Sequence, residues 1–157
     1  MYGEALRLAD LNSEDVVYDL FCGTGTLGLL AARFVKQVVG IEISKEAALD
    51  GRTNAKANDL DNVTIVDGSV EDVLKNHTFS KPTICLIDPP RAGLSPDAFQ
   101  QVMALNSPKI VYISCNPQTQ ARDVKAFLQN GYRLLVMQPV DQFPQTPHIE
   151  NIVLLQK

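Results

Sequence analysis

Short apolar runs rich in β-branched residues alternate along the chain with longer segments whose apolar positions recur every three or four residues. The short runs predict strands and the longer segments predict amphipathic helices. The predicted strands cover residues 16–21, 37–43, 63–66, 83–87, 110–114, 133–139 and 151–155, and the predicted helices cover 26–34, 45–58, 96–105 and 119–130. This alternation predicts an α/β, Rossmann-like fold with a doubly wound, mostly parallel sheet of seven strands.

The end of the chain departs from the alternation. No helical pattern separates the last two predicted strands, which are joined only by the segment VDQFPQTPHIE. A parallel neighbour needs a long crossover connection, whereas an antiparallel neighbour accepts a direct loop. We therefore expect the last strand to run antiparallel.

Polar residues gather just after each of the first five predicted strands. The segments are DLFCGTG, EIS, DGSVED, DPPRAG and SCNPQT, in chain order. Because parallel strands end at the same edge of a sheet, and because ligands bind at that edge, these segments predict one site.

Length and composition narrow the class of protein. The 157 residues fit one domain, 1–157, and a hydrophobic content of 45% is typical of globular proteins. No apolar run approaches the roughly 20 residues that cross a membrane, and the start, MYGEALRLADLN, lacks the layout of a signal peptide. Three cysteines without C-x-x-C spacing argue against a disulfide scaffold and a structural zinc site. We expect no metal and a reducing compartment, the cytoplasm or an organelle of a eukaryotic cell.

The net charge of −4 gives no support to attraction of nucleic acid by the whole surface. Any contact with RNA is therefore expected to be local or to lie outside this chain.

The segment DLFCGTGTLG contains the G-x-G-x-x-G spacing of nucleotide-binding turns, at Gly23, Gly25 and Gly28. Glu42 ends the second predicted strand, where a carboxylate can bind ribose hydroxyls. Both features fit NAD as well as S-adenosylmethionine. Asp19 distinguishes the two, because a carboxylate repels a pyrophosphate but attracts an ammonium or sulfonium group. We therefore predict S-adenosylmethionine as the cofactor, with capping of the turn as the alternative role of Asp19.

The segment DGSVED is predicted to line the adenine of the cofactor. Asp67 or Ser69 can reach the exocyclic amine, and the backbone of Val70 can contact a ring nitrogen. A D-G pair is also common in ordinary turns.

Asp88 ends the fourth predicted strand in IDPPRAG, where two prolines restrict the backbone. A related D-P-P sequence followed by an aromatic residue is typical of enzymes that methylate exocyclic amines, where the ring stacks on the base. Arg91 occupies that position here. This disfavours amine methylation and favours a contact between Arg91 and a phosphate or carbonyl of the substrate.

Cys115 ends the fifth predicted strand, immediately before a helix start at Asn116. The positive end of a helix stabilises a thiolate, whereas Cys22 and Cys85 are better explained as packing residues. Beside a methyl donor, a thiolate can add to carbon 6 of a pyrimidine and make carbon 5 nucleophilic.

A base must then remove the proton from carbon 5 before the thiol can leave. Glu150 is favoured for this step by its place at the start of the last strand, and His148 is the alternative.

The segments DLFCGTGTLGL, GIEIS, LIDPPRAGL, YISCNPQTQARD and DQFPQTPHIENIVLL span most of the chain. Together they resemble the S-adenosylmethionine-dependent RNA uracil carbon-5 methyltransferases, which make 5-methyluridine in tRNA and ribosomal RNA. The resemblance implies a class I methyltransferase sheet, with Cys115 as nucleophile, Glu150 as base, Asp88 as an active-site carboxylate and Glu42 as the ribose ligand. Arg91 and Asn116 are the candidate substrate contacts.

Members of the resembled family carry an F-F-Q-type motif ahead of this domain, and many also carry an OB-like RNA-binding domain or an iron–sulfur cluster. We therefore expect the RNA-binding segments to lie outside this chain. The segment SCNPQTQARD favours the ribosomal-RNA members. The alternatives are a domain that binds S-adenosylmethionine without turnover and a cytosine carbon-5 methyltransferase, while Asp19 and Cys115 disfavour an NAD-dependent oxidoreductase.

Overall fold

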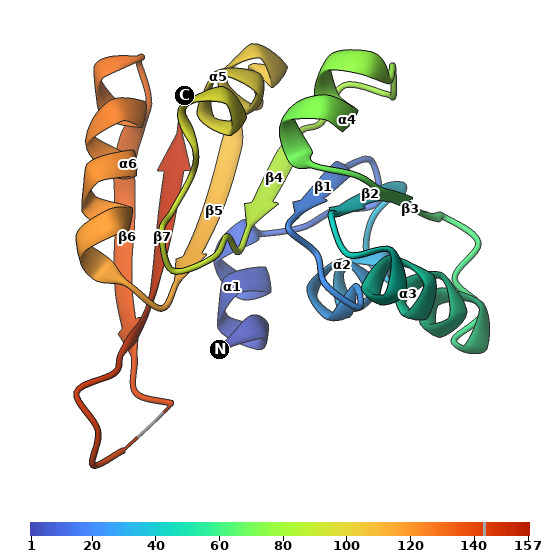
Figure 1. Cartoon of the computed structure of the whole chain (residues 1–157), viewed down its shortest axis with the longest axis horizontal. Helices are drawn as coiled ribbons and strands as arrows, with labels where there is room; N and C mark the ends of the chain where they lie inside the picture. The colour runs from blue at the N-terminus through green and yellow to red at the C-terminus, as the bar shows by residue number, and fades with distance from the viewer. Residues whose placement is uncertain (143) are drawn as a thin grey trace.

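The computed structural model describes residues 1–142 and 144–157. Within these residues, seven strands form one sheet in the order β3-β2-β1-β4-β5-β7-β6 (Figure 1). All neighbouring strands pair in parallel except β7, which runs antiparallel to both β5 and β6. The predicted fold and the antiparallel last strand are therefore confirmed. The strands are β1 (Val16–Leu20), β2 (Gln37–Glu42), β3 (Val63–Asp67), β4 (Ile84–Ile87), β5 (Lys109–Ser114), β6 (Arg133–Val140) and β7 (Glu150–Gln156).

Helices cover both faces of the sheet. The first three helices lie on one face and the last three on the other (Figure 1). Two of them, α1 and α4, were not expected from the hydrophobic pattern. Along the described chain the helices are α1 (Tyr2–Ala9), α2 (Thr26–Ala32), α3 (Lys45–Ala57), α4 (Val70–Asn76), α5 (Pro96–Leu105) and α6 (Pro117–Gln129).

The two faces of the sheet build two separate cores. Because side chains alternate along a strand, Val16, Tyr18 and Leu20 of β1 pack toward α4, α5 and α6, whereas Val17 packs toward α1 and α2. Asp19 shares the face of Val17. The alternation therefore directs a carboxylate into the buried interface between β1 and α2.

The direction of chain progression reverses between β1 and β4, which are neighbours in the sheet. The chain moves outward from β1 to β2 and β3, and then returns to β4 and continues on the other side. The loops after β1 and β4 diverge at this switch point and open a crevice at the carboxyl edge. β1 ends one residue earlier than predicted, because Phe21 adopts a left-handed backbone with φ of 65°.

Candidate active site

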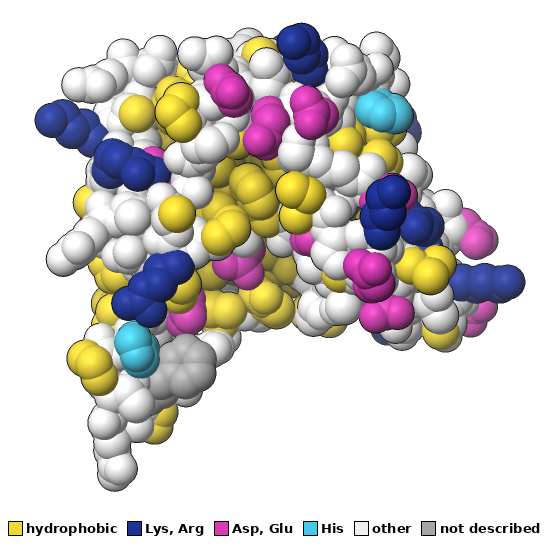
Figure 2. Space-filling view, in the orientation of Figure 1, with side chains coloured by type: hydrophobic (Ala, Val, Ile, Leu, Met, Phe, Trp, Pro, Cys, Tyr) yellow, Lys and Arg dark blue, Asp and Glu magenta, His cyan; other side chains and the backbone are white. Residues whose placement is uncertain are grey.

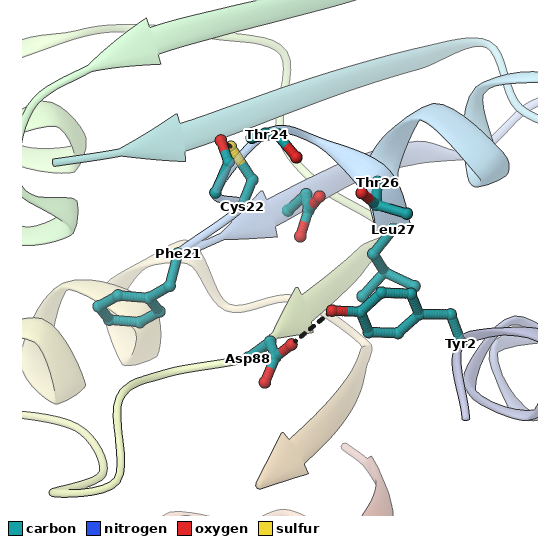
Figure 3. A pocket seen from close by; sticks show the side chains of 9 residues that line it. Tyr2, Phe21, Cys22, Thr24, Thr26, Leu27 and Asp88 are labelled. Carbon is teal, nitrogen blue, oxygen red and sulfur yellow. Dashed lines mark hydrogen bonds between the residues drawn. The ribbon is translucent and has the colours of Figure 1, made fainter. Parts of the chain in front are cut away.

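A cavity of about 300 Å³ lies at the switch point (Figure 3). It is lined by the loop after β1 and the first turn of α2, by Tyr2 of α1 and by Asp88 after β4. In the space-filling view, hydrophobic side chains line a hollow in the middle of one face, and the Lys and Arg side chains on that face lie toward its periphery (Figure 2).

Asp19 is the buried polar group of this cavity, with 1% of its surface exposed. Its Oδ2 accepts a hydrogen bond of 2.8 Å from the backbone N–H of Gly28, while Oδ1 has no partner among the described residues. Burial raises the pKa of Asp19 to about 7, and the charges of Asp88 and Glu42 act in the same direction, whereas the Gly28 N–H opposes them. A buried carboxylate oxygen without a partner is suited to bind a cation. Asp19 therefore caps the start of α2 and still has a free oxygen.

Gly28 allows this close approach. A Cβ atom at position 28 would lie 2.8 Å from Oδ2 of Asp19 and 3.0 Å from Cγ1 of Val38. A side chain at this position would therefore have to displace the Asp19 carboxylate or shift α2 relative to β1.

Glu42 links the ends of the first two strands. Its Oε2 accepts a hydrogen bond of 2.8 Å from the N–H of Gly23, and its Oε1 accepts one of 2.8 Å from the N–H of Ser44. Gly23 and Gly25 adopt left-handed φ angles of 55° and 84°, which glycine reaches without strain. Glu42 is half-buried, and each carboxylate oxygen has a second lone pair that can accept from a ribose hydroxyl.

A second cavity, of about 210 Å³, adjoins the first and shares Phe21 with it. Apolar side chains dominate its lining, which includes Ile43, Val70 and Pro90, and Ser69 also contributes to it. Asp67, a candidate for the same ligand, is exposed outside this lining and pairs with Arg52 at 3.3 Å. An apolar slot next to the glycine turn is suited to a flat ring such as adenine.

Asp88 lies at the rim of the first cavity, at the end of β4, and is half-buried. The hydroxyl of Tyr2 donates a hydrogen bond of 3.1 Å to its Oδ2 (Figure 3). Burial raises the pKa of Asp88, and the hydrogen bond from Tyr2 opposes this rise. The sequence did not indicate Tyr2 as a site residue, because its helix, α1, was not predicted.

Pairing between β5 and β7 places Cys115 and Glu150 at the same edge of the sheet. Ser114 lies opposite Asn151 in the antiparallel register. Cys115 directly follows Ser114 beyond the end of β5, and Glu150 directly precedes Asn151 as the first residue of β7. Cys115 is half-buried and directly precedes Asn116, the N-cap of α6.

Glu150 is buried, with 8% of its surface exposed, whereas His148 is exposed in the preceding loop. Burial raises the pKa of Glu150, and the charge of Asp88 adds to the rise. A carboxylate with a raised pKa is a stronger base. Phe143, in the same sequence motif, lies outside the described residues.

The other two cysteines are poor sources of a thiolate. Burial raises the pKa of Cys85 to about 12, and it raises the pKa of Cys22 well above its ordinary range. A Cβ atom on Gly40 would lie 3.0 Å from Sγ of Cys22, so this thiol is packed against β2.

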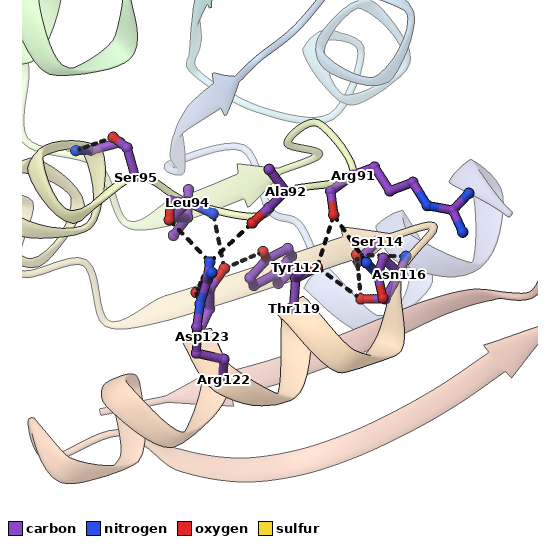
Figure 4. A network of polar contacts seen from close by, with 11 residues as sticks. Arg91, Ala92, Leu94, Ser95, Tyr112, Ser114, Asn116, Thr119, Arg122 and Asp123 are labelled. Carbon is purple, nitrogen blue, oxygen red and sulfur yellow. Dashed lines mark hydrogen bonds and ion pairs between the residues drawn. The ribbon is translucent and has the colours of Figure 1, made fainter.

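The loop after β4 is tied to the start of α6 through Arg91 (Figure 4). Its carbonyl accepts hydrogen bonds from Nδ2 of Asn116 at 3.2 Å and from the hydroxyl of Thr119 at 3.0 Å. Oδ1 of Asn116 accepts from the N–H of Gln118 at 3.1 Å, so both ends of this amide contact the protein. The guanidinium of Arg91 is exposed and makes no hydrogen bond or ion pair with other described residues, which leaves it available to a ligand.

Asp123 of α6 anchors the same loop from below (Figure 4). Its Oδ2 accepts from the N–H of Leu94 at 2.9 Å and from the hydroxyl of Tyr112 at 2.7 Å. Arg122 pairs with Asp123 at 2.8 Å and donates to the carbonyls of Ala92 and Leu94. The loop after β4 and the helix that follows Cys115 therefore form one hydrogen-bonded unit.

The sheet order, the antiparallel β7 and the cavity at the switch point define a Rossmann-like methyltransferase fold. The precorrin-6y C5,15-methyltransferase of Geobacter metallireducens superposes with a TM-score of 0.82 over 99% of this chain and 87% of its own, and at 16% identity this likeness concerns the fold alone. The tRNA (uracil-54, C5)-methyltransferase of Pyrococcus abyssi, solved in complex with S-adenosyl-L-homocysteine, superposes with a TM-score of 0.82 at 30% identity, over 98% of this chain and 37% of its own.

Sequence comparison specifies the family. The model of the tRNA (uracil-5-)-methyltransferase family matches residues 1–157, and the chain belongs to this family. An uncharacterized RNA methyltransferase of Protochlamydia amoebophila is 52% identical over 99% of this chain and 36% of its own length, and one of Clostridium tetani is 43% identical over 90% of this chain and 31% of its own. The chain thus spans about a third of the length of these curated relatives. Among the described residues, no helix is both long and apolar enough to cross a membrane.

Proposed function

We propose that this chain is the catalytic domain of an RNA methyltransferase that uses S-adenosylmethionine to methylate carbon 5 of a uridine in tRNA or ribosomal RNA. The single observation that supports it most is the register of β5 and β7, which pairs Ser114 with Asn151 and so leaves the neighbouring Cys115 and Glu150 at the sheet edge that also holds Asp19 and Asp88. A nucleophile, a base and a cation site at one edge are the groups that this reaction needs.

The residues present fit the cofactor. Asp19 has a buried oxygen without a partner, suited to a cationic group. Glu42, at the end of β2, can accept hydrogen bonds from the ribose hydroxyls, and the apolar slot beside Phe21 is suited to adenine. When bound, S-adenosylmethionine supplies an electrophilic methyl group. The S-adenosyl-L-homocysteine bound in the solved Pyrococcus abyssi relative, which is S-adenosylmethionine without its methyl group, supports the same choice.

Cys115 and Glu150 act at opposite ends of the proposed reaction. The thiolate of Cys115 adds to carbon 6 of uracil, and the electron pair moves to carbon 5, which becomes nucleophilic. Once carbon 5 bears the methyl group, Glu150 removes its proton, the double bond re-forms and the thiolate leaves. The raised pKa of Glu150 favours this proton transfer.

RNA is proposed as the substrate because the matching relatives are RNA methyltransferases. Because the net charge of −4 does not attract RNA to the whole surface, contact with RNA has to be local. The guanidinium of Arg91, which is exposed and unpaired among the described residues, is available to bind a phosphate or a carbonyl of the RNA. We propose that further RNA contacts come from segments outside this chain, which spans about a third of the length of its curated relatives.

Trapping with 5-fluorouridine tests the proposal. RNA transcripts of tRNA and ribosomal RNA containing this base, incubated with the protein and S-adenosylmethionine, should form a covalent adduct that survives a denaturing gel, because fluorine on carbon 5 cannot be removed as a proton. Cys115→Ala should abolish the adduct and Cys22→Ala should keep it. Cofactor binding without any adduct would favour a domain that binds S-adenosylmethionine without turnover, and trapping only by 5-fluorocytidine would indicate a cytosine substrate.

A further inference from the structure

Tyr2 brings the only phenol into the first cavity among its described lining residues. We infer that Tyr2 is a positioning residue for methyl transfer, whose hydroxyl, hydrogen-bonded to Asp88 at the rim of the cavity, holds the Asp88 carboxyl group in its ionised form. This inference rests on the function proposed above. It assigns a role to α1, a helix that the sequence motifs do not include.

The position of the phenol is determined by the packing of α1. Tyr2, Ala5 and Ala9 are spaced along one side of the helix, and Ala5 and Ala9 are fully buried against the sheet. Lys109, at the start of β5, donates a hydrogen bond to the carbonyl of Ala9 and holds the other end of the helix. The helix therefore presents the Tyr2 hydroxyl to Asp88 from a rigid base (Figure 3).

Carboxylates surround the phenol. The pKa of Tyr2 is raised to about 12, first by burial, then by the charge of Asp88 and the hydrogen bond to Asp88, and least by the charges of Asp19 and Glu150. The hydroxyl therefore stays protonated at neutral pH and can only donate to Asp88. A hydrogen bond donated to a carboxylate favours the ionised form.

The titratable groups that interact electrostatically with Asp88 come from four elements. They are Tyr2 of α1, Asp19 of β1, Tyr112 of β5 and Glu150 of β7. The charge of Asp88 raises the pKa of two of them, Asp19 and Glu150, and the donor from Tyr2 opposes the effect of burial on Asp88 itself. Because the charge of Asp88 in turn raises the pKa of Glu150, loss of the Tyr2 hydroxyl should reach the base as well.

Tyr2→Phe tests this role, because it removes the hydroxyl and keeps the ring. The acidic limb of the profile of kcat against pH should shift to a higher pH by about one unit, which is the scale of one hydrogen bond to a charged group. At high pH, where Asp88 is ionised in both proteins, the rates should converge. Tyr18→Phe is the matched control, since its hydroxyl donates to the carbonyl of Ser80 outside the cavity.

A second readout is independent of turnover. The carboxyl carbon of Asp88, followed by NMR in the free protein, should titrate at a higher pH in Tyr2→Phe than in the wild type. A loss of rate that is equal at every pH, together with an unchanged titration of Asp88, would overturn the inference and leave only a packing role. If the wild type itself transfers no methyl group, the proposed function fails, and the titration alone still decides whether Tyr2 controls Asp88.

Discussion

Replacing Asp19 by Asn should stabilise the free protein and weaken its binding of the cofactor. The pKa of Asp19 is raised from an ordinary 3.8 to about 7, which corresponds to roughly 4 kcal/mol at about 1.4 kcal/mol for each pKa unit. Asn keeps an acceptor for the N–H of Gly28 but buries two donors. We therefore expect the gain in the free energy of unfolding to be smaller, on the order of 1–3 kcal/mol at pH 8.

The difference in stability between the variant and the wild type should change with pH in a defined direction. Below pH 3.8 the carboxyl holds its proton in both the folded and the unfolded protein, so no penalty exists. Between pH 3.8 and about 7 the unfolded chain releases the proton first, and the stability of the wild type falls as pH rises. Above pH 7 the penalty is complete. The difference between Asp19→Asn and the wild type should therefore grow from pH 4 to pH 7 and then stay constant.

Urea unfolding followed by circular dichroism, at intervals from pH 4 to pH 8, measures this difference. Calorimetric titration with S-adenosylhomocysteine at pH 8 should show at least a tenfold loss of affinity in the variant, about 1.4 kcal/mol or more, because the cation site is gone. A variant less stable than the wild type at pH 8 would show that Asp19 is not a destabilising buried charge. Unchanged affinity would remove it from the cofactor site.

Three further changes test other parts of the site. Glu42→Ala should weaken S-adenosylhomocysteine binding by roughly 1.5–3 kcal/mol in the same titration, because it removes the ribose acceptor and frees the N–H of Gly23; unchanged binding would leave Glu42 as a loop tether only. Gly28→Ala should lower the free energy of unfolding by about 1–3 kcal/mol in urea, since the added methyl group would lie 2.8 Å from Asp19; full stability would refute the packing described for α2. Asp88→Ala should reduce kcat much more than cofactor affinity, and equal losses in both would make Asp88 a cofactor ligand alone.

The sheet is predictable from the sequence because its central strands are apolar runs. β1, β4 and β5 are buried on both faces, so their composition alone marks them. The missed helices α1 and α4 have eight and seven residues, about two turns, so a helical period hardly stands out; α2 is equally short but is marked by the glycine turn before it. The start of α4 also lies in DGSVED, where Ser69 caps the helix in a sequence typical of turns.

The site is predictable where its residues lie at strand ends. Asp19 is the last residue but one of β1, and Asp88 and Cys115 directly follow β4 and β5, so the parallel sheet brings them to one edge whatever the details of packing. Tyr2 and Asp123 lie within helices, where a polar residue usually faces solvent, and only the tertiary structure turns them toward the loop after β4. The free oxygen of Asp19 likewise depends on how closely α2 packs on β1.

The order of events at Cys115 and Glu150 is the central claim of the proposed mechanism. Glu150→Gln keeps addition and methyl transfer but removes the base, so the reaction should stop while the uracil is still bonded to sulfur.

The decisive measurement is therefore a denaturing gel of Glu150→Gln incubated with unmodified tRNA and ribosomal RNA transcripts and S-adenosylmethionine labelled in its methyl group. A labelled protein–RNA complex should accumulate, and it should be absent when Cys115→Ala is added to the same chain. Normal turnover of Glu150→Gln, or a labelled complex that persists without Cys115, would contradict the mechanism.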